Sequence, residues 1–289
     1  MFIVKYKSIF IGLAVVLVLT SFALMAKFGI RQGVDFTGGT VIETRYVADM
    51  PETIDVAGLQ AQDIRSFKTG TSTYKFISTK SYDELRPVLI EAVAQGKYIY
   101  EETQVNTVGP TLGLELKRKA GIAIAVVVLA ILAFIAFSFR EVSRPVSSWK
   151  YGVIAMVTLL HDIIVPTGVY VLLSYYFGAE IDTLFVIALL TILGISISDK
   201  IVVFDRIREN LKSGNIKNFD DVVGVSLKQT FTRSINTSVT VILALVALFY
   251  FGPEATKFFA LTLTIGMIVG TYSSIFVASP LLTVWNKGK

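Results

Sequence analysis

TILGISISDKIVVFDRIREN, residues 191–210, is the stretch that decides the fold. It begins inside a long apolar run and ends in a cluster of charges, which predicts a membrane helix that leaves the bilayer near Asp205. Asp199 lies six residues before Asp205. At a helical rise of about 1.5 Å per residue, its carboxylate is roughly 9 Å inside the apolar run.

A carboxylate at this depth requires an explanation. An ionised aspartate near the centre of a spanning helix costs on the order of 2.5–3.5 kcal/mol on insertion scales, so it usually faces a bundle interior, a partner charge or a water path. The alternative is that Asp199 snorkels or is protonated. Ser196 lies three residues before Asp199, which predicts a polar stripe on the helix and favours a functional carboxylate.

The composition indicates an integral membrane protein. Of 289 residues, 53% are hydrophobic and only 17% are charged, against about 25% charged in soluble domains. The absence of cysteine excludes disulfides and thiolate chemistry, and a single histidine leaves little material for a metal site. We therefore expect no cofactor, no metal and no enzyme activity. The net charge of +5 is attributed to loops that orient the helices, not to nucleic-acid binding.

Three regions are predicted along the chain: a first transmembrane helix in 1–30, an α+β domain in 31–119, and five further transmembrane helices in 120–289. The apolar run 8–26 is longer than a signal-peptide core, so an uncleaved helix is favoured over a cleaved signal. The later spans are expected at 120–139, 151–177, 183–204, 234–251 and 258–285. Both termini are predicted to lie in the cytoplasm. This orientation follows from basic stretches between the spans, at 140–150, with Arg140 and Arg144, and at 206–233.

The polar region 31–119 reads as a small α+β domain. Strands are predicted at 40–46, 62–68, 73–79 and 97–107, with a turn at 69–72. A helix is expected at 81–94, where Ser81 and Glu84 form a capping-box pattern, and a shorter helix at 53–60.

Two other sets of buried polar residues are predicted. His161 and Asp162 lie near the middle of the third span, before Pro166, and the alternative is a helix kink with a satisfied polar pair. Arg233 opens a polar face on the fifth span at a depth similar to that of Asp199, so the two side chains are candidates to meet. The alternative for Arg233 is an anchor at the membrane surface.

Gly266 and Gly270 form a GxxxG pattern in the last span, which predicts close helix packing.

The chain resembles the SecF family, the smaller membrane subunit of the bacterial SecDF protein-export complex. The resemblance rests on the run Asp35, Phe36, Thr37, Gly38 and Gly39, on Val-Gly-Pro at 108–110, on 197–210, on 270–280 and on the His-Asp pair at 161–162. It covers essentially the whole chain. The chain departs from the family at 195 and 198, where Tyr and Asn are common and Ile and Ser stand here.

The resemblance implies a resistance-nodulation-division membrane fold, with a ferredoxin-like periplasmic domain in a complete or an abbreviated form. It implies SecD, the SecYEG channel, the translocating preprotein and membrane lipid as partners, and a cytoplasmic-membrane location. The family's proton-path aspartate matches Asp199 and its essential arginine matches Arg233, so the expected proton relay is Asp199, Arg233, His161 and Asp162. The expected function is proton-driven assistance to protein export.

Two alternatives remain open: half of a proton-coupled small-molecule exporter, and a structural membrane scaffold. An exporter would usually have larger outer domains, and a scaffold does not explain the buried charges.

Overall fold

The computed structural model describes residues 2–47, 56–68, 72–91, 99–138, 148–214, 216 and 218–286. The chain divides into two compact units. The helical unit comprises Met1–Gly29, Ala123–Leu172 and Leu184–Lys289, and the sheet unit comprises Ile30–Ile122 and Leu173–Thr183. Parts of the predictions for 53–55, 69–71, 92–94 and 97–98, and the residues Arg140 and Arg144, lie outside the described residues.

Six helical segments in the described chain are long and apolar enough to cross a membrane, as predicted. The helices that form them are α2 (Lys7–Phe28), α6 (Pro110–Ser138), α7 (Ser148–Phe177), α8 (Thr183–Ser213), α9 (Phe219–Phe251) and α10 (Lys257–Tyr272), with α10 continued by η3 (Ser273–Ala278) and α11 (Ser279–Asn286). The short α1 (Phe2–Lys5) and η2 (Glu254–Thr256) precede α2 and α10.

Several helices are longer than the sequence predicts because they continue into polar turns. The clearest case is α9, which begins at Phe219 and not near 234. Asn218 caps it, since the Asn218 side chain accepts a hydrogen bond from the Asp220 amide at 3.1 Å. Hydropathy detects only the apolar part of such a helix.

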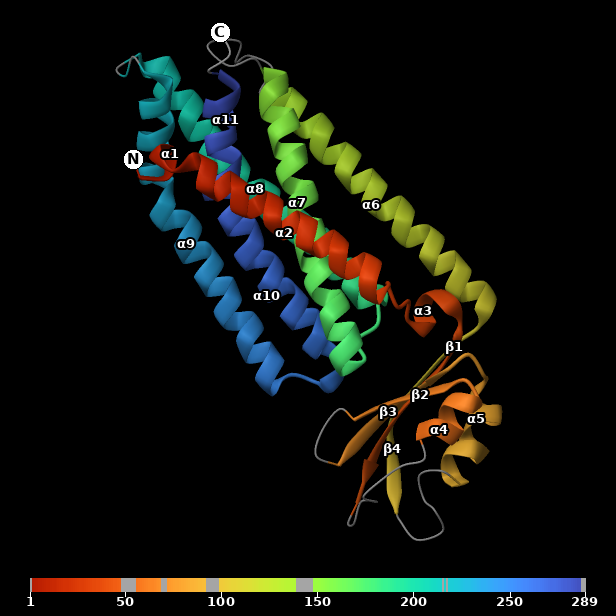
Figure 1. Ribbon diagram of the computed structural model, residues 1–289. Helices are drawn as coiled ribbons and strands as arrows, with labels where there is room; N and C mark the ends of the chain where they lie inside the picture. The colour runs from red at the N-terminus through yellow and green to blue at the C-terminus, as the bar shows by residue number, and fades with distance from the viewer. Residues whose placement is uncertain are drawn as a thin grey trace. The chain divides into compact units, whose positions relative to one another are not determined.

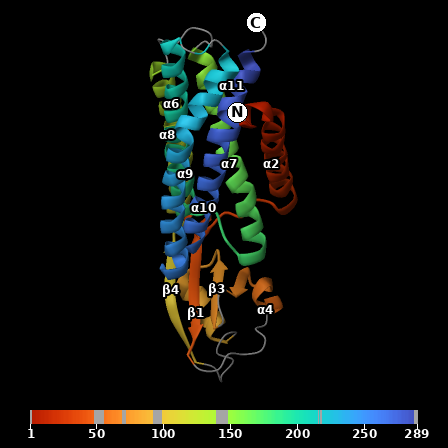
Figure 2. The same ribbon diagram turned by 90° about the vertical axis from the view of Figure 1, so that its left-hand side faces the viewer.

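The core of the helical unit is made by α7, α8 and the last span. About half of each of these is buried, whereas α2, α6 and α9 are mostly exposed. Tyr151, Leu193 and Phe204 belong to the core cluster. Helix α9 lies alongside α10 (Figures 1 and 2).

The predicted GxxxG positions face α8. A Cβ atom at Gly266 would collide with the Ile192 side chain, and one at Gly270 would lie 3.2 Å from the Ser196 hydroxyl. The two glycines therefore allow α10 to approach α8 closely at the level of the polar residues of α8.

The sheet unit has the predicted α+β fold. Its elements are β1 (Gly39–Tyr46), α4 (Val56–Ala61), β2 (Ile64–Lys68), β3 (Thr73–Ser78), α5 (Tyr82–Leu89) and β4 (Tyr100–Val108). The sheet is antiparallel with the order β2-β3-β1-β4, which with its helices is the ferredoxin-like arrangement.

Helices α4 and α5 cover one face of the sheet (Figure 1). Leu59 and Leu85 from these helices pack with Ile42 and Phe76 from the strands in one buried cluster.

The start of helix α5 differs from the prediction in one respect. Ser81 is the N-cap of α5, but its side chain makes no capping hydrogen bond, so the predicted capping box is not formed.

Candidate functional site

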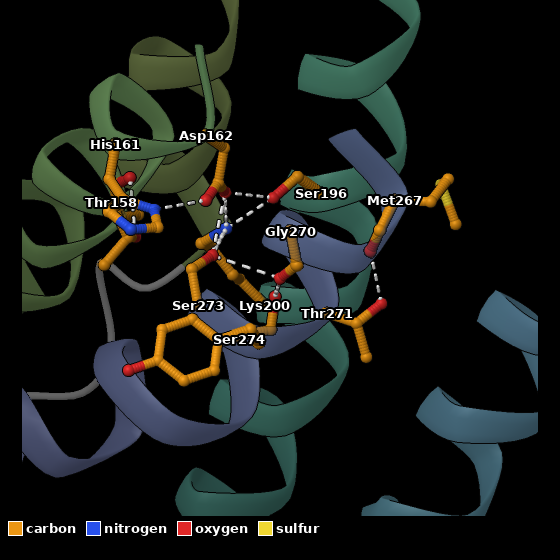
Figure 3. Close-up of polar contacts among 12 residues, drawn as sticks. Thr158, His161, Asp162, Ser196, Lys200, Met267, Gly270, Thr271, Ser273 and Ser274 are labelled. Atoms are coloured by element: carbon orange, nitrogen blue, oxygen red, sulfur yellow. Dashed lines mark hydrogen bonds and ion pairs between the residues drawn. The ribbon is translucent and has the colours of Figure 1, made fainter. Parts of the chain in front are cut away.

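The centre of the helical unit holds a buried ion pair between two helices. Lys200 on α8 places its Nζ atom 2.5 Å from Oδ2 of Asp162 on α7, and neither side chain is exposed (Figure 3). Because two opposite unit charges compensate each other here, the pair can exist where a single charge would be very costly.

Two serine hydroxyls complete the surroundings of the pair. Ser196 and Ser273 lie 2.5 and 3.0 Å from the Lys200 ammonium, and both donate hydrogen bonds to Oδ2 of Asp162. Ser273 opens η3, a π-helix that follows α10. The cluster draws its side chains from α7, α8 and η3 (Figure 3). The Asp162 carboxylate and the two serine hydroxyls together give each of the three N–H donors of the Lys200 ammonium an oxygen acceptor.

His161 extends the cluster on the other side of Asp162. Its Nδ1 atom lies 2.9 Å from Asp162 Oδ1, while its buried Nε2 atom has no hydrogen-bond partner among the described residues. His161 also lines an apolar cavity of about 350 Å³ with Val157 and Val277. Helix α7 continues through Pro166. The pair at 161–162 is thus part of an interhelical network and not merely a polar pair at a kink.

Asp199 points to a different neighbour from Lys200. Its Oδ1 atom accepts a hydrogen bond of 2.5 Å from Ser234 on α9, and its buried Oδ2 atom has no partner within the described chain. Asp199 and Arg233 line one cavity of about 240 Å³. The described ion pairs do not include one between Asp199 and Arg233.

Arg233 lies where two cavities adjoin. It lines the cavity of Asp199 and a second cavity, of about 300 Å³, that contains Asp205 and Glu209. Its side chain is exposed in the single chain. Arg233 therefore borders both the cavity of Asp199 and the charged end of α8.

The structure separates residues that the sequence predicts to lie on one polar stripe. Ser196 and Lys200 face Asp162, whereas Asp199 faces Ser234. Ser196 also lines the cavity of Asp199, so it belongs to both groups. The predicted relay residues therefore form two adjacent sites, His161 with Asp162 and Asp199 with Arg233.

Sequence reasoning missed Lys200 and Ser273. Lys200 follows Asp199 in the same apolar run, and a buried Asp162 implies a cation at similar depth on another helix. That signal was sufficient to identify Lys200. Ser273 gave no comparable signal, because its position depends on the π-helical turn.

The Asp-Phe-Thr-Gly-Gly motif forms a tight connection in the sheet unit. In α3 (Val34–Thr37), Asp35 accepts a hydrogen bond of 3.0 Å from the amide of Thr183, while Phe36 is buried and Thr37 donates to the Gly33 carbonyl. Asp35 thus satisfies a free amide at the start of α8.

Both glycines of this motif have backbone angles that other residues rarely adopt. Gly38 and Gly39 have φ values of 76° and 126°. A Cβ atom at Gly38 would lie 2.8 Å from the Cα atom of Pro110, and one at Gly39 would collide with the Ser78 carbonyl. Gly39 also pairs with Val108 in the sheet. The motif requires glycine at both positions.

An ion pair in the sheet unit joins Arg65 and Glu180 at 2.6 Å. Glu180 is 6% exposed. Burial raises the pKa of the Glu180 carboxyl, although Arg65 and Lys75 act in the opposite direction.

Within the described residues, no cluster of three or more His, Asp or Glu side chains could hold a metal ion.

Comparisons with known proteins identify relatives over nearly the whole length. Residues 89–288 match the family described as protein export membrane protein SecD/SecF, C-terminal, and residues 23–49 match the SecD/SecF GG motif. A protein translocase subunit SecF from Thermobaculum terrenum is 39% identical, covering 98% of this chain and 93% of its own length. One from Synechocystis is 37% identical, covering 89% of this chain and 83% of its own length.

A solved structure has the same fold. SecDF from Thermus thermophilus, described as a translocon-associated membrane protein, superposes with a TM-score of 0.84 at 30% identity. SecDF in a super-membrane-facing form superposes with a TM-score of 0.68 at 31% identity. Each alignment covers 98% of this chain, and the chain spans 38% of the length of each SecDF chain.

Proposed function

The chain belongs to the SecF family of protein-export membrane proteins, and from that premise we propose that it is a non-enzymatic accessory subunit of the Sec translocase. In this role it works with SecD and uses the proton-motive force to promote preprotein movement across the bacterial cytoplasmic membrane. Its membrane part is of the resistance-nodulation-division type, and both termini are cytoplasmic.

The observation that carries this proposal is the set of ionisable side chains inside the helical unit. The Lys200–Asp162 pair is fully buried, and Asp199 has a buried oxygen without a partner beside a cavity that Arg233 also lines. Structural packing would be achieved at lower cost by apolar side chains. Moving one elementary charge through 100 mV supplies about 2.3 kcal/mol, which changes a conformational equilibrium by more than tenfold.

The exposed polar face of α9 supports a membrane partner. The polar side chains on this face are exposed in the single chain, although contact of polar side chains with lipid is energetically unfavourable. They are Arg233, Asn236, Thr237 and Thr240. A homologous helical unit that covered this face would also close the cavity shared by Asp199 and Arg233. SecD is the partner we propose for this face, with the SecYEG channel, the preprotein and membrane lipid as further partners.

A structural scaffold is a weaker alternative, because it gives no role to the buried charges. Half of a small-molecule exporter is also weaker. In its described part the sheet unit forms a single four-stranded sheet whose buried apolar residues pack into one cluster, which favours a small folded domain over a substrate-binding domain.

The proposal is tested by preprotein export into inverted membrane vesicles that contain the Sec channel and SecD. We expect addition of this chain to stimulate export, and an uncoupler to remove the stimulation while leaving ATP-driven export intact. Stimulation that persists unchanged with the uncoupler would contradict a role for the proton-motive force. Absence of stimulation in energised vesicles would contradict the export role itself.

A further inference from the structure

A cavity of about 350 Å³ lies between α2, α7 and the end of the last span, all within the helical unit. Its lining residues are aliphatic except for Thr158 and His161. Helix α2 contributes Ala14 and Val15, among others. The volume falls within the range of about 300–1,000 Å³ that is typical of pockets for small molecules.

His161 brings a hydrogen-bond acceptor to this apolar surface. Its Nδ1 atom lies 2.9 Å from Oδ1 of Asp162, and a carboxylate oxygen can only accept, so Nδ1 carries the hydrogen atom. The Nε2 atom of the neutral ring is then an acceptor. An imidazolium is unfavourable here, because Lys200 already balances the charge of Asp162.

The Nε2 atom lies on the side of the ring that borders the cavity. His161 lines the cavity and Asp162 does not, so the ring turns the edge opposite Nδ1 toward it. In Figure 3 the second ring nitrogen points away from Asp162. Nε2 is buried and has no hydrogen-bond partner among the described residues.

The neighbouring hydroxyl groups are already engaged. The Thr158 hydroxyl donates to carbonyls of the preceding turn of α7, and the Tyr272 hydroxyl donates to the Phe10 carbonyl at 2.7 Å. Buried waters usually make about three hydrogen bonds, and the cavity lining offers only two polar side chains. The lining therefore suits an apolar molecule that brings its own donor for Nε2.

The cavity opens near the middle of the spanning segments. His161 lies close to the midpoint of α7. Val15, Val157 and Leu160 at the cavity are 52%, 52% and 47% exposed in the single chain. Because the midpoint of a spanning helix lies in the hydrocarbon core, the cavity is reached from the lipid phase. A phospholipid acyl chain at this depth has no hydrogen-bond donor.

We propose that this cavity binds a membrane-dissolved small molecule with an apolar body and one hydroxyl group, which donates a hydrogen bond to His161 Nε2. The aliphatic side chains of α2, α7 and the last span hold the body, and Nε2 selects the hydroxyl. A body without a donor leaves Nε2 unsatisfied, which costs binding free energy. The proposal does not depend on the proposed function.

The first test uses the fact that the chain contains a single histidine. Nitrogen NMR of the full chain with isotope-labelled histidine, in phosphatidylcholine nanodiscs, reports on His161 alone. Titration with para-pentylphenol should move the Nε2 resonance saturably to lower frequency, as expected when this nitrogen accepts a hydrogen bond. The methyl ether para-pentylanisole has the same body and no donor, so it should not produce this shift.

Two results of this titration would overturn the proposal. One is the absence of a saturable Nε2 shift with para-pentylphenol, and the other is an equal shift with para-pentylanisole. Both are measured on the wild-type chain, so neither depends on whether a variant folds.

A competition experiment distinguishes this site from a groove for lipid tails. Pentylbenzene, which has the apolar body alone, should displace para-pentylphenol about tenfold less effectively than unlabelled para-pentylphenol displaces a labelled sample, at equal concentrations in the lipid phase. Equal displacement would show that the cavity accepts any apolar chain, and it would contradict selection by the hydroxyl.

A variant that fills the cavity locates the binding. Ala14 is 5% exposed and lines the cavity, so Ala14→Leu should weaken para-pentylphenol binding by at least about tenfold. Ala23→Leu makes the same change at an exposed position of α2 and should bind like the wild type. Wild-type affinity in a folded Ala14→Leu chain would place the binding elsewhere and overturn the proposal. These measurements use neither SecD nor a membrane potential, so their outcome is separate from that of the export test.

Discussion

Lys200 Nζ on α8 lies 2.5 Å from Asp162 Oδ2 on α7, and both side chains are fully buried. Each charge is tolerated only because of the other. Their relationship is therefore best tested by changing them separately and then together.

Asp162→Asn alone should destabilise the chain by about 3–5 kcal/mol, because it leaves the Lys200 ammonium uncompensated. Lys200→Met alone should have a similar effect. The double variant should be more stable than the sum of the single effects, with a coupling of about 0.5–3 kcal/mol. Unfolding of the purified chain in mixed detergent micelles measures all four stabilities. Strict additivity would show that the ion pair does not couple α7 to α8.

Asp199→Asn should assemble normally and lose proton-dependent export, because asparagine keeps the shape but cannot ionise. The readout is export stimulation with and without uncoupler. Asp221→Asn is the control, since Asp221 is an exposed aspartate in the first turn of α9, away from the cavities that Asp199 and Arg233 line. Wild-type, uncoupler-sensitive stimulation by Asp199→Asn would remove this residue from the coupling step.

Arg233→Lys should be impaired less than Arg233→Met. Lysine keeps the positive charge in the cavity shared with Asp199 but loses the planar guanidinium, whereas methionine removes the charge. Relative export rates of the two variants at equal membrane levels measure the difference. Equal activity of both variants would indicate that Arg233 acts only as an anchor at the membrane surface.

Gly39→Val should reduce the amount of folded chain, because its φ of 126° and its contact with the Ser78 carbonyl exclude a side chain. Protease resistance of the sheet unit measures the effect. Gly109→Val is a suitable control, since a Cβ atom there has no neighbour within 4 Å. Full protease resistance of Gly39→Val would show that the sheet tolerates a side chain at this turn.

Stability should decrease as pH rises through the titration of Glu180. Its pKa is raised above the ordinary 4.5, so the folded chain holds this proton more tightly than the unfolded chain. The resulting stabilisation is complete below the pKa of Glu180 in the unfolded chain, and it is lost above the pKa of Glu180 in the folded chain. Melting temperature should therefore fall less between pH 4 and pH 7 in Glu180→Gln than in the wild type. Glu84→Gln, at an exposed position of α5, should behave like the wild type; an identical slope in all three chains would contradict the assignment.

The sequence was sufficient for the number and order of the main elements in the described chain, but not for the start of α9 or for the π-helical turn at Ser273. Long apolar runs predicted the six spanning segments found among the described residues, and alternation with turn residues predicted the strands of the sheet. Depth arithmetic predicted that Asp199 and Arg233 could meet; the two residues line one cavity, but the described ion pairs do not join them.

Rotation about a helix axis is harder to predict than depth. The turn of about 100° between adjacent residues sends Asp199 toward α9 and Lys200 toward α7, and no periodicity of one helix reveals which neighbour lies on which side. The capping box at Ser81 failed for a related reason, because a sequence pattern does not fix a side-chain rotamer.

The tight contact of Gly38 with Pro110 has a mechanical consequence. The chain enters the sheet through Gly39 and leaves it through Val108, and these residues are paired, while Gly38 packs directly against Pro110. The entering and leaving segments are therefore fastened together at the base of the sheet. Tension applied to any strand is therefore divided between two chain connections, the segment that follows α2 and the first turn of α6.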